Sequence, residues 1–518
     1  MSAELVRRIW ARDPSVWSSQ PAGHREIAQR LGWLTLPEDM APAADRLTSL
    51  AEDIRKTFRR VVLMGMGGSS LAPEVLWRAF GARPDWPTFQ LMDSTDPDAV
   101  HAATAAASPA ESLFIVASKS GGTVETDALF RHFWKLAPRG EQFVAITDPD
   151  TPLAALAAEH RFRHLFLNPP DVGGRYSALS YFGLVPAALI GIDVARLLER
   201  AREMAGACAP SSALDRNPGY RLGDLLGRGA SQLQRDKATL WMGPEIRGFG
   251  LWAEQLVAES TGKDGRGVLP VVDEPVGPPE AYRDDRVFLL SALEGGGEAA
   301  DSATVRALVE RRAPMEQVTL RDRYDLGAEF FRWEFGTAVA GAILGVDPFD
   351  QPNVAESKRN TAEILKQLET RGARFETPAA LTKDSIRRWI DAAASAGYVA
   401  LLAYAPPTPE NDRHLAELRR RLRDRLRVAT TAGYGPRYLH STGQYHKGGP
   451  QTGAFVLITV EHQHDLDVPG KGYTFGALQE AQALGDWEAL HRRNRPVLRL
   501  HLSQRGADLG EAVERITA

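Results

Sequence analysis

Short apolar runs alternate with amphipathic helical stretches from residue 59 onward, and this alternation constrains the fold more than any other feature of the chain. A continuous apolar run is typical of a strand that is covered on both faces, as in a parallel sheet. The first set of runs lies at residues 61–66, 89–92, 113–117, 143–147 and 165–167. Alternation of this kind predicts an α/β protein with helices on both faces of a parallel sheet.

A second alternating set follows later in the chain and predicts a second α/β domain. Its runs lie at residues 239–242, 287–290, 399–404, 427–431, 455–460 and 497–502. A helical stretch at about 328–368 separates two of these runs. Within that stretch Pro352 indicates a break followed by a new helix, because proline is tolerated in a first helical turn. We therefore expect two doubly wound parallel-sheet domains, the second of which contains a helical insertion.

These two sets of runs also predict the domain boundaries. We expect residues 1–48 to form a helical N-terminal segment and residues 49–210 to form the first domain. Residues 225–518 are expected to form the second domain, with its helical insertion and a C-terminal extension.

The charge of the chain limits the partners that it can attract. A net charge of -4 over 518 residues provides no basic field for nucleic acid, so any anion must be bound by a local site. The single cysteine, Cys208, excludes an internal disulfide and fits a reducing compartment.

The N-terminus lacks the basic start and apolar core of a secretory signal. The longest apolar run, residues 178–192, is shorter than the ~20 residues that span a bilayer and indicates a buried helix. We therefore expect a cytoplasmic protein without a membrane partner.

Residues 112–125 combine an apolar strand, a glycine turn rich in hydroxyl groups, and the start of a helix. Gly121 and Gly122 let the backbone turn its amides inward, and Thr123 begins a helix whose first amides are unpaired. Ser118 and Ser120 add hydroxyl donors. A phosphate monoester is the natural occupant of such a loop, although a well-capped turn between strand and helix would have the same residues.

A second glycine turn, at residues 65–70, follows the first apolar run. A dinucleotide site would have glycine where this chain has Ser70, so the fingerprint of such a site is absent. The turn is either a ligand loop with Ser69 directed toward the ligand or a purely structural tight turn.

Glu259 lies near the end of a helix, on the same apolar face as Trp252 and Leu256. Burial would raise the pKa of this carboxyl and make it a better general base near neutral pH. The alternative is an i, i+4 ion pair with Lys263, with Gly262 ending the helix. Spacing alone does not decide between the two.

Several other side chains are candidates for a site. Arg175 lies on a glycine turn and would stabilise negative charge. Gln351 and Lys358 flank the start of the helix that Pro352 opens, and His440 and His446 lie in a glycine-rich loop. Zinc is a poor interpretation of these histidines, because the chain has one cysteine and no His-Glu-x-x-His sequence.

Taken together and in order, these segments resemble the phosphoglucose isomerase family, whose members are built from two sugar-isomerase (SIS) domains. The resemblance rests on five motifs: Gly67-Gly-Ser-Ser, Ser118-Lys-Ser-Gly-Gly-Thr, Val172-Gly-Gly-Arg-Tyr-Ser, Glu259-Ser-Thr-Gly-Lys and Asp350-Gln-Pro-Asn-Val-Ala-Glu-Ser-Lys. The C-terminal segments 435–449 and 473–479 are most similar to isomerase modules fused behind a transaldolase in some bacteria. No transaldolase barrel fits ahead of residue 59, so only the isomerase half is implied.

The resemblance implies a role for each matching residue. Ser118, Ser120 and Thr123, with the amides around Lys119, would hold the phosphate of a sugar phosphate. Gly68 and Ser69 would line the sugar.

The resemblance also implies the residues of the proton transfer. Glu259 would move the proton between C2 and C1 while Arg175 stabilises the enediolate, in the division of labour that triosephosphate isomerase also uses. Gln351 would contact the ligand and Lys358 would assist ring opening. The family needs no metal or other cofactor, and a homodimer with sites near its interface is implied.

One departure from the family concerns its ring-opening histidine, which lies between the motifs of the base and the lysine. This chain has no histidine from residue 261 to residue 358. Either His440 or His446 would have to supply the role, and Gly443-Gln-Tyr-His favours His446 because it partly matches the Gly-Gln-His of the family.

The activity implied is the reversible interconversion of glucose 6-phosphate and fructose 6-phosphate through a cis-enediol, in glycolysis and gluconeogenesis. Two alternatives remain open. Pro352 and Asn353 after Gln351, and the glycines at 121 and 122, alter the pocket and would admit mannose 6-phosphate as well. A noncatalytic SIS protein that senses sugar phosphates would need only the phosphate loop.

Overall fold

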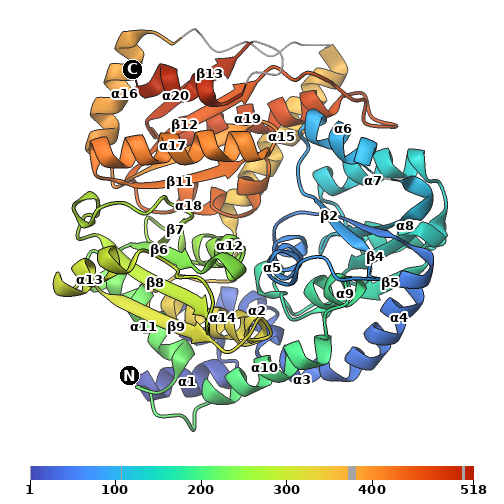
Figure 1. Ribbon diagram of the computed structural model, residues 1–518, viewed down its shortest axis with the longest axis horizontal. Coiled ribbons are helices and arrows are strands. Elements are labelled where there is room, and N and C mark those ends of the chain that lie inside the picture. The colour runs from blue at the N-terminus through green and yellow to red at the C-terminus, as the bar shows by residue number, and fades with distance from the viewer. Residues whose placement is uncertain (1, 107, 372–380, 504–507, 518) are drawn as a thin grey trace.

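The computed structural model describes residues 2–106, 108–371, 381–503 and 508–517, and three parallel sheets organise this part of the chain (Figure 1). The first sheet has the order β2-β1-β3-β4-β5. Its strands are β1 (Arg60–Gly65), β2 (Thr88–Met92), β3 (Ser112–Ala117), β4 (Phe143–Thr147) and β5 (His164–Leu167). Every residue of β3 is buried, which is why that strand reads as a continuous apolar run.

The second set of runs is divided between two sheets. One has the order β7-β6-β8-β9, with β6 (Lys237–Met242), β7 (Leu269–Val272), β8 (Arg286–Leu293) and β9 (Met315–Leu320). The other has the order β11-β10-β12-β13, with β10 (Tyr398–Tyr404), β11 (Ala429–Tyr434), β12 (Gly453–Val460) and β13 (Val497–Leu502). The α/β class with parallel sheets is thus confirmed, while residues 225–518 contain two sheets where the sequence suggested one continuous domain.

Helices connect the strands and cover both faces of each sheet (Figure 1). In the first third of the chain they are α1 (Ser2–Trp10), α2 (Pro21–Ala28), α3 (Leu36–Asp39), α4 (Ala44–Thr57), α5 (Leu71–Phe80), α6 (Pro97–Ala106), α7 (Val124–Leu136) and α8 (Pro152–Glu159). The middle third contains α9 (Tyr181–Leu189), α10 (Val194–Ala207), α11 (Pro218–Gln232), α12 (Phe249–Thr261), α13 (Ser302–Glu310) and α14 (Asp325–Leu344). The last third contains α15 (Pro352–Arg371), α16 (Lys383–Ala394), α17 (Pro409–Leu426), α18 (Gly443–Gly448), α19 (Phe475–His491) and α20 (Gly510–Thr517).

The long helical stretch is broken where proline predicted a break. α14 ends at Leu344, and α15 begins at Pro352. The apolar run 178–192 contains the buried helix α9, as expected. Within the described residues no helix is both long and apolar enough to cross a membrane.

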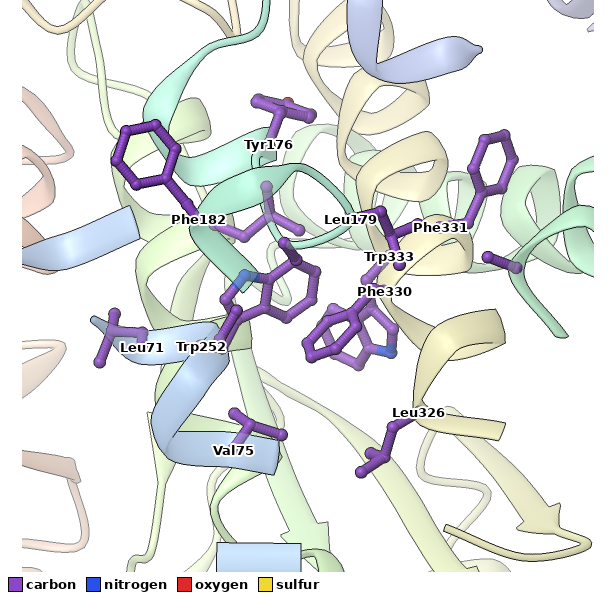
Figure 2. Close-up of a cluster of buried hydrophobic side chains, with 14 of the residues drawn as sticks. Leu71, Val75, Tyr176, Leu179, Phe182, Trp252, Leu326, Phe330, Phe331 and Trp333 are labelled. Carbon is purple, nitrogen blue, oxygen red and sulfur yellow. The ribbon is translucent and has the colours of Figure 1, made fainter. Parts of the chain in front are cut away.

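An aromatic core joins the first two sheets and holds α12 in place (Figure 2). Trp252 of α12 packs edge-on against Phe330 of α14, with ring centroids 4.8 Å apart. Tyr176, Phe182 and Val75 line the same cluster from the side of the first sheet. Burial of this many large side chains fixes the position of α12 relative to the loops of the first sheet.

The N-terminal helices are also tied to the middle of the chain. Trp10 Nε1 donates a hydrogen bond to the carbonyl oxygen of Cys208 at 2.9 Å, and Trp17 Nε1 donates to that of Ala338 at 2.8 Å. The N-terminal segment therefore braces α10 and α14.

Candidate active site

Two loops of the first sheet meet where the strand order reverses. β1 has β2 on one side and β3 on the other, and ligands of open α/β sheets bind at the carboxyl ends of strands at such a point. The loop after β1 forms a short 3-10 helix, η4 (Gly67–Ser69), and the loop after β3 leads into α7. The sequence-predicted candidates Gly68, Ser69 and Ser118 all lie here.

Close contact between backbones explains the glycines after β1. A Cβ on Gly68 would lie 1.9 Å from the carbonyl oxygen of Gly174, so η4 packs directly on the turn η7 (Gly174–Tyr176). Gly67 has a φ of +56°, in the left-handed region that favours glycine. Ser69 is buried beside them.

The hydroxyl-rich loop after β3 is partly open to solvent. Ser118 Oγ and Thr123 Oγ1 are 2.9 Å apart and hydrogen-bonded, while Ser120 is exposed. Thr123 is the N-cap of α7 but its side chain makes no capping hydrogen bond, so the first amides of this helix are available to a ligand. Lys119 is directed away, into an ion pair with Asp148.

Arg175 and Glu259 form a buried pair beside these loops. Arg175 Nη1 lies 3.7 Å from Glu259 Oε1, and both side chains are 5% exposed. Arg175 Nε donates to Ser260 Oγ at 2.7 Å, and Nη2 donates to the carbonyl oxygens of Pro348 and Asp350 at 2.6 and 2.8 Å. These contacts hold the guanidinium between η7, α12 and the segment that precedes α15.

Gln351 also reaches this arginine. Its Oε1 accepts a hydrogen bond from Arg175 Nη1 at 3.3 Å, although the residue as a whole is exposed. Lys358 belongs to α15, but its side chain lies outside the described residues.

Glu259 is not paired with Lys263. Lys263 Nζ contacts Asp350 Oδ1 at 2.5 Å instead, and burial lowers the pKa of this lysine to about 8. Glu259 Oε2 accepts a hydrogen bond from Gln255 Nε2 at 3.1 Å, and the same Nε2 donates to the carbonyl oxygen of His440 at 2.8 Å. Gln255 therefore links the Glu259 carboxylate to the part of the chain that surrounds the third sheet, β11-β10-β12-β13, which we call the third sheet's unit.

His440 lies against both loops of the first sheet. It ends the 3-10 helix η10 (Arg437–His440), and a Cβ on Gly67 would lie 3.2 Å from the His440 Cβ. Its Nε2 is hydrogen-bonded to Glu125 Oε1 at 2.9 Å, and Glu125 is a buried residue in the first turn of α7. Gln482 Nε2 donates to the same oxygen at 2.7 Å. A carboxylate held in this way fixes the orientation of the imidazole ring.

His446 lies in the core of the third sheet's unit. Its Nδ1 is hydrogen-bonded to the Tyr398 hydroxyl at 3.1 Å, and its ring centroid is 5.2 Å from that of Phe455. The side chain is almost fully buried, and this burial lowers its pKa well below the ordinary value of histidine.

The part of the chain that contains the Arg175–Glu259 pair is similar to known proteins. The sequence profile of phosphoglucose isomerase matches residues 46–264, which include every motif of the resemblance except the last. A relative from Haloarcula marismortui, named "Probable glucose-6-phosphate isomerase", is 30% identical over 373 residues, which are 64% of this chain and 81% of the relative. The chain belongs to the phosphoglucose isomerase family.

Other relatives agree with this assignment. The glucose-6-phosphate isomerase of Rubrobacter xylanophilus is 31% identical over 361 residues, 58% of this chain and 81% of the relative. A solved structure of a hypothetical protein from Thermus thermophilus has a TM-score of 0.60 at 26% identity, covering 70% of this chain and 93% of that one. A glucose-6-phosphate isomerase from Chlamydia trachomatis shares the fold, with a TM-score of 0.53 at 19% identity over 71% of this chain and 78% of that one.

For this member of the phosphoglucose isomerase family, the sequence reasoning gave no role to three residues that contact the candidate site residues: Gln255, Glu125 and Ser260. Gln255 lies four positions before Glu259 on the same helix face, so the spacing could have indicated it. Glu125 lies only two residues after Thr123, in the first turn of α7, but nothing local signals its partner His440. Ser260 belongs to the Glu259 motif, yet its contact with Arg175 depends on the packing of η7.

Proposed function

We propose that this phosphoglucose isomerase family member interconverts glucose 6-phosphate and fructose 6-phosphate through a cis-enediol. The observation that carries the proposal is the buried Arg175–Glu259 pair, 3.7 Å apart, beside the two glycine loops of the first sheet. A base next to a fixed cation is the arrangement that abstraction of a proton α to a carbonyl requires. The names of the curated relatives support the same reaction.

Phosphate binding would fall to the start of α7. The amides of the first turn, the positive end of the helix and the hydroxyls of Ser118, Ser120 and Thr123 together suit a phosphate dianion. Lys119 contributes through its backbone, since its side chain is paired with Asp148. Gly68 and Ser69 would border the sugar.

Proton transfer is assigned to Glu259. The carboxylate removes the proton from C2 of the open-chain aldose, and the electron pair moves to the carbonyl oxygen O1 to give the enediolate. The proton of the O2 hydroxyl is then transferred to O1, and Glu259 returns its proton to C1 as the C2 carbonyl forms, which gives the ketose. The developing negative charge on oxygen is stabilised by Arg175, whose position is held by Ser260 and two backbone carbonyls. Gln351, which accepts a hydrogen bond from the Arg175 guanidinium, would contact the ligand beside it.

Ring opening needs an acid for the ring oxygen and a base for the hydroxyl on C1. We assign this role to His440, supported by its hydrogen bond to Glu125 and its contact with η4. His446, which the motif favoured, is hydrogen-bonded to Tyr398 in the core and is the weaker candidate. Lys358 would assist, as the family resemblance implies.

The family resemblance also underlies three further proposals: a cytoplasmic homodimer, the use of sugar phosphate without cofactor, and a particular similarity to the isomerase modules that are fused to a transaldolase in some bacteria.

A coupled assay of the full chain with fructose 6-phosphate tests the reaction. Glu259→Gln should lower kcat by about 100-fold or more, since general-base catalysis contributes about 10²–10⁴. Glu254→Gln is the matched control, because it removes a buried carboxylate from the same helix and should leave turnover unchanged. Full activity of the Glu259→Gln variant would overturn the mechanism.

The same assay separates the alternatives. Turnover of mannose 6-phosphate at a comparable rate would extend the substrate range to the C2 epimer. Binding of fructose 6-phosphate without turnover and without exchange of solvent deuterium into C2 would support a sugar-phosphate sensor instead.

A further inference from the structure

The strand order also reverses within the third sheet. β10 lies between β11 and β12, and the helices that follow β10 and β12 cover opposite faces. α17, after β10, packs through Leu418 into the same cluster as Leu401, whereas α19, after β12, packs through Leu490 into the cluster of Leu457. The carboxyl ends of β10 and β12 are therefore a place where a ligand is expected, apart from the isomerase site.

A cavity of about 500 Å³ lies at this place, between the first and third sheets. Residues 406–408, 460, 461 and 463 border it from the ends of β10 and β12, and residues 90–94, 98, 99, 102 and 103 close it from the side of β2 and α6. The residues that line it include the carboxylates Asp93, Asp98 and Glu461 but no lysine, arginine or histidine. Such a lining suits a cation.

Three metal-ligating groups meet at the wall of this cavity. Asp96 and Asp98 precede and open α6, and His462 follows β12 between two lining residues. One ligand atom of each lies within 4.8 Å of the other two. His462 Nδ1 is 3.5 Å from Asp96 Oδ2 and 3.7 Å from Asp98 Oδ2.

These separations match a bound ion. Nitrogen and oxygen ligands at about 2.0–2.2 Å from a tetrahedral zinc ion are about 3.3–3.6 Å apart. His462 Nδ1 is buried and has no hydrogen-bond partner among the described residues, which is unusual for a buried ring nitrogen. An ion between the three groups would satisfy it.

Hydrogen bonds already orient both carboxylates. Gln479 Nε2 donates to Asp96 Oδ2 at 3.2 Å, and the Gln463 amide donates to Asp98 Oδ2 at 3.0 Å. His464 Nδ1 is hydrogen-bonded to Asp98 Oδ1 at 2.9 Å. Each Oδ2 keeps a second lone pair for a metal, and this pattern is the outer shell that metal ligands usually have.

We propose that Asp96, Asp98 and His462 bind one divalent transition-metal ion of the Zn²⁺ type. The ion joins a loop of the first sheet to a loop of the third and so fastens these two units together. The site is distinct from the isomerase site and independent of the proposed function.

Calorimetric titration of the metal-free full chain with Zn²⁺, together with elemental analysis after dialysis, tests the site. We expect one equivalent and a rise in the melting temperature, since an ion that binds only the folded chain stabilises it. Gln479→Leu removes a residue that orients a ligand and should weaken binding of Zn²⁺ by about 10–100-fold. His462→Gln removes a ligand itself and should weaken it by more than that. His462→Gln breaks no hydrogen bond of Nδ1, so it should fold normally.

A second group of the same residue types is the control. Glu410, His414 and Asp508 also lie within reach of one ion, but two of the three are exposed. His414→Gln should leave the tight equivalent intact. The proposal is overturned if no equivalent binds, if His462→Gln binds Zn²⁺ as the parent does, or if His414→Gln abolishes the binding. Isomerase turnover of the metal-free chain is measured separately, so failure of one proposal leaves the other standing.

Discussion

At the scale of single residues, two histidines six positions apart have opposite environments. His440 is hydrogen-bonded to Glu125 beside the loop that follows β3, and His446 is hydrogen-bonded to Tyr398 in a core. We predict that His440→Gln lowers kcat for glucose 6-phosphate by about 100-fold, the scale of a lost acid–base group. His446→Gln should mainly lower the melting temperature. Both variants are measured in the coupled assay and by thermal unfolding, and the reverse outcome would reassign the role to His446.

Comparing the cyclic sugar with its open-chain form tests the role of His440 more specifically. If His440 acts only in ring opening, its loss should slow the cyclic sugar more than the exchange of the C2 proton in the open-chain form. An equal loss in both measurements would place His440 in the proton transfer itself.

Glu254 provides a pH prediction at the same scale. Burial raises the pKa of its carboxyl to about 8, above the ordinary value of 4.5. The folded state therefore binds more protons than the unfolded state between these pH values, and the contribution of Glu254 to stability is lost as pH rises from about 4.5 to about 8. Glu254→Gln should be more stable than the parent at pH 9, by on the order of a few kcal/mol, and similar to it near pH 4.5. Thermal unfolding at the two pH values measures the difference; a gap independent of pH would contradict this account.

At the scale of elements, the contact between η4 and η7 sets the distance between the loop after β1 and Arg175. Gly68→Ala would place a Cβ 1.9 Å from the Gly174 carbonyl oxygen, and backbone on both sides leaves no easy relief. We predict a loss of about 1–3 kcal/mol of stability and a fall in kcat, because η7 must move with Arg175. Gly206→Ala, in α10, is the control, since its Cβ would have nothing within 4 Å. Equal activity in the two variants, measured in the coupled assay, would show that this contact is unimportant.

The strands show which elements could be predicted from the sequence and which could not. Strands such as β3 and β10 are buried on both faces, so their continuous apolar runs predicted them. β7 was missed because it is short and contains Pro270, and β9 because its Glu316, Gln317 and Thr319 interrupt the apolar pattern at a sheet edge.

Local motifs likewise indicated Ser118, Arg175 and Glu259 but not their partners. The pairing of Lys263 with Asp350, and of His440 with Glu125, depends on elements far apart in the chain. Spacing along one helix favours the i, i+4 pair of Glu259 and Lys263 and contains no information about a competing carboxylate brought in by tertiary packing.

At the scale of the whole molecule, the third sheet lies above the second in Figure 1, with the first to the right, and its unit brings His440 against the loop after β1. Arg437, at the start of η10, joins the two units. Its guanidinium is ion-paired with Glu74 of α5, and its Nε lies 3.3 Å from Asp93 Oδ2 after β2. Both carboxylates are buried, and Arg437 is the cation that contacts both, although Arg78 Nη2 also lies 2.6 Å from Glu74 Oε1.

Arg437→Gln should therefore act on stability and on catalysis together. Loss of Arg437 leaves Glu74 with Arg78 alone and removes the cation next to Asp93, which is expected to cost about 3 kcal/mol, the lower end of the cost of breaking a buried ion pair. Because His440 lies three residues further along η10, kcat should fall by about 10–100-fold, as a displacement of about 1 Å can do. Arg420→Gln, on the exposed face of α17, removes ion pairs that are open to solvent and should change stability by about 0.5 kcal/mol or less. If Arg437→Gln unfolds earlier but keeps full kcat below its melting temperature, the third sheet's unit positions His440 by other contacts. The hydrogen bond from the Gln255 side chain to the His440 carbonyl oxygen then becomes the one to remove next.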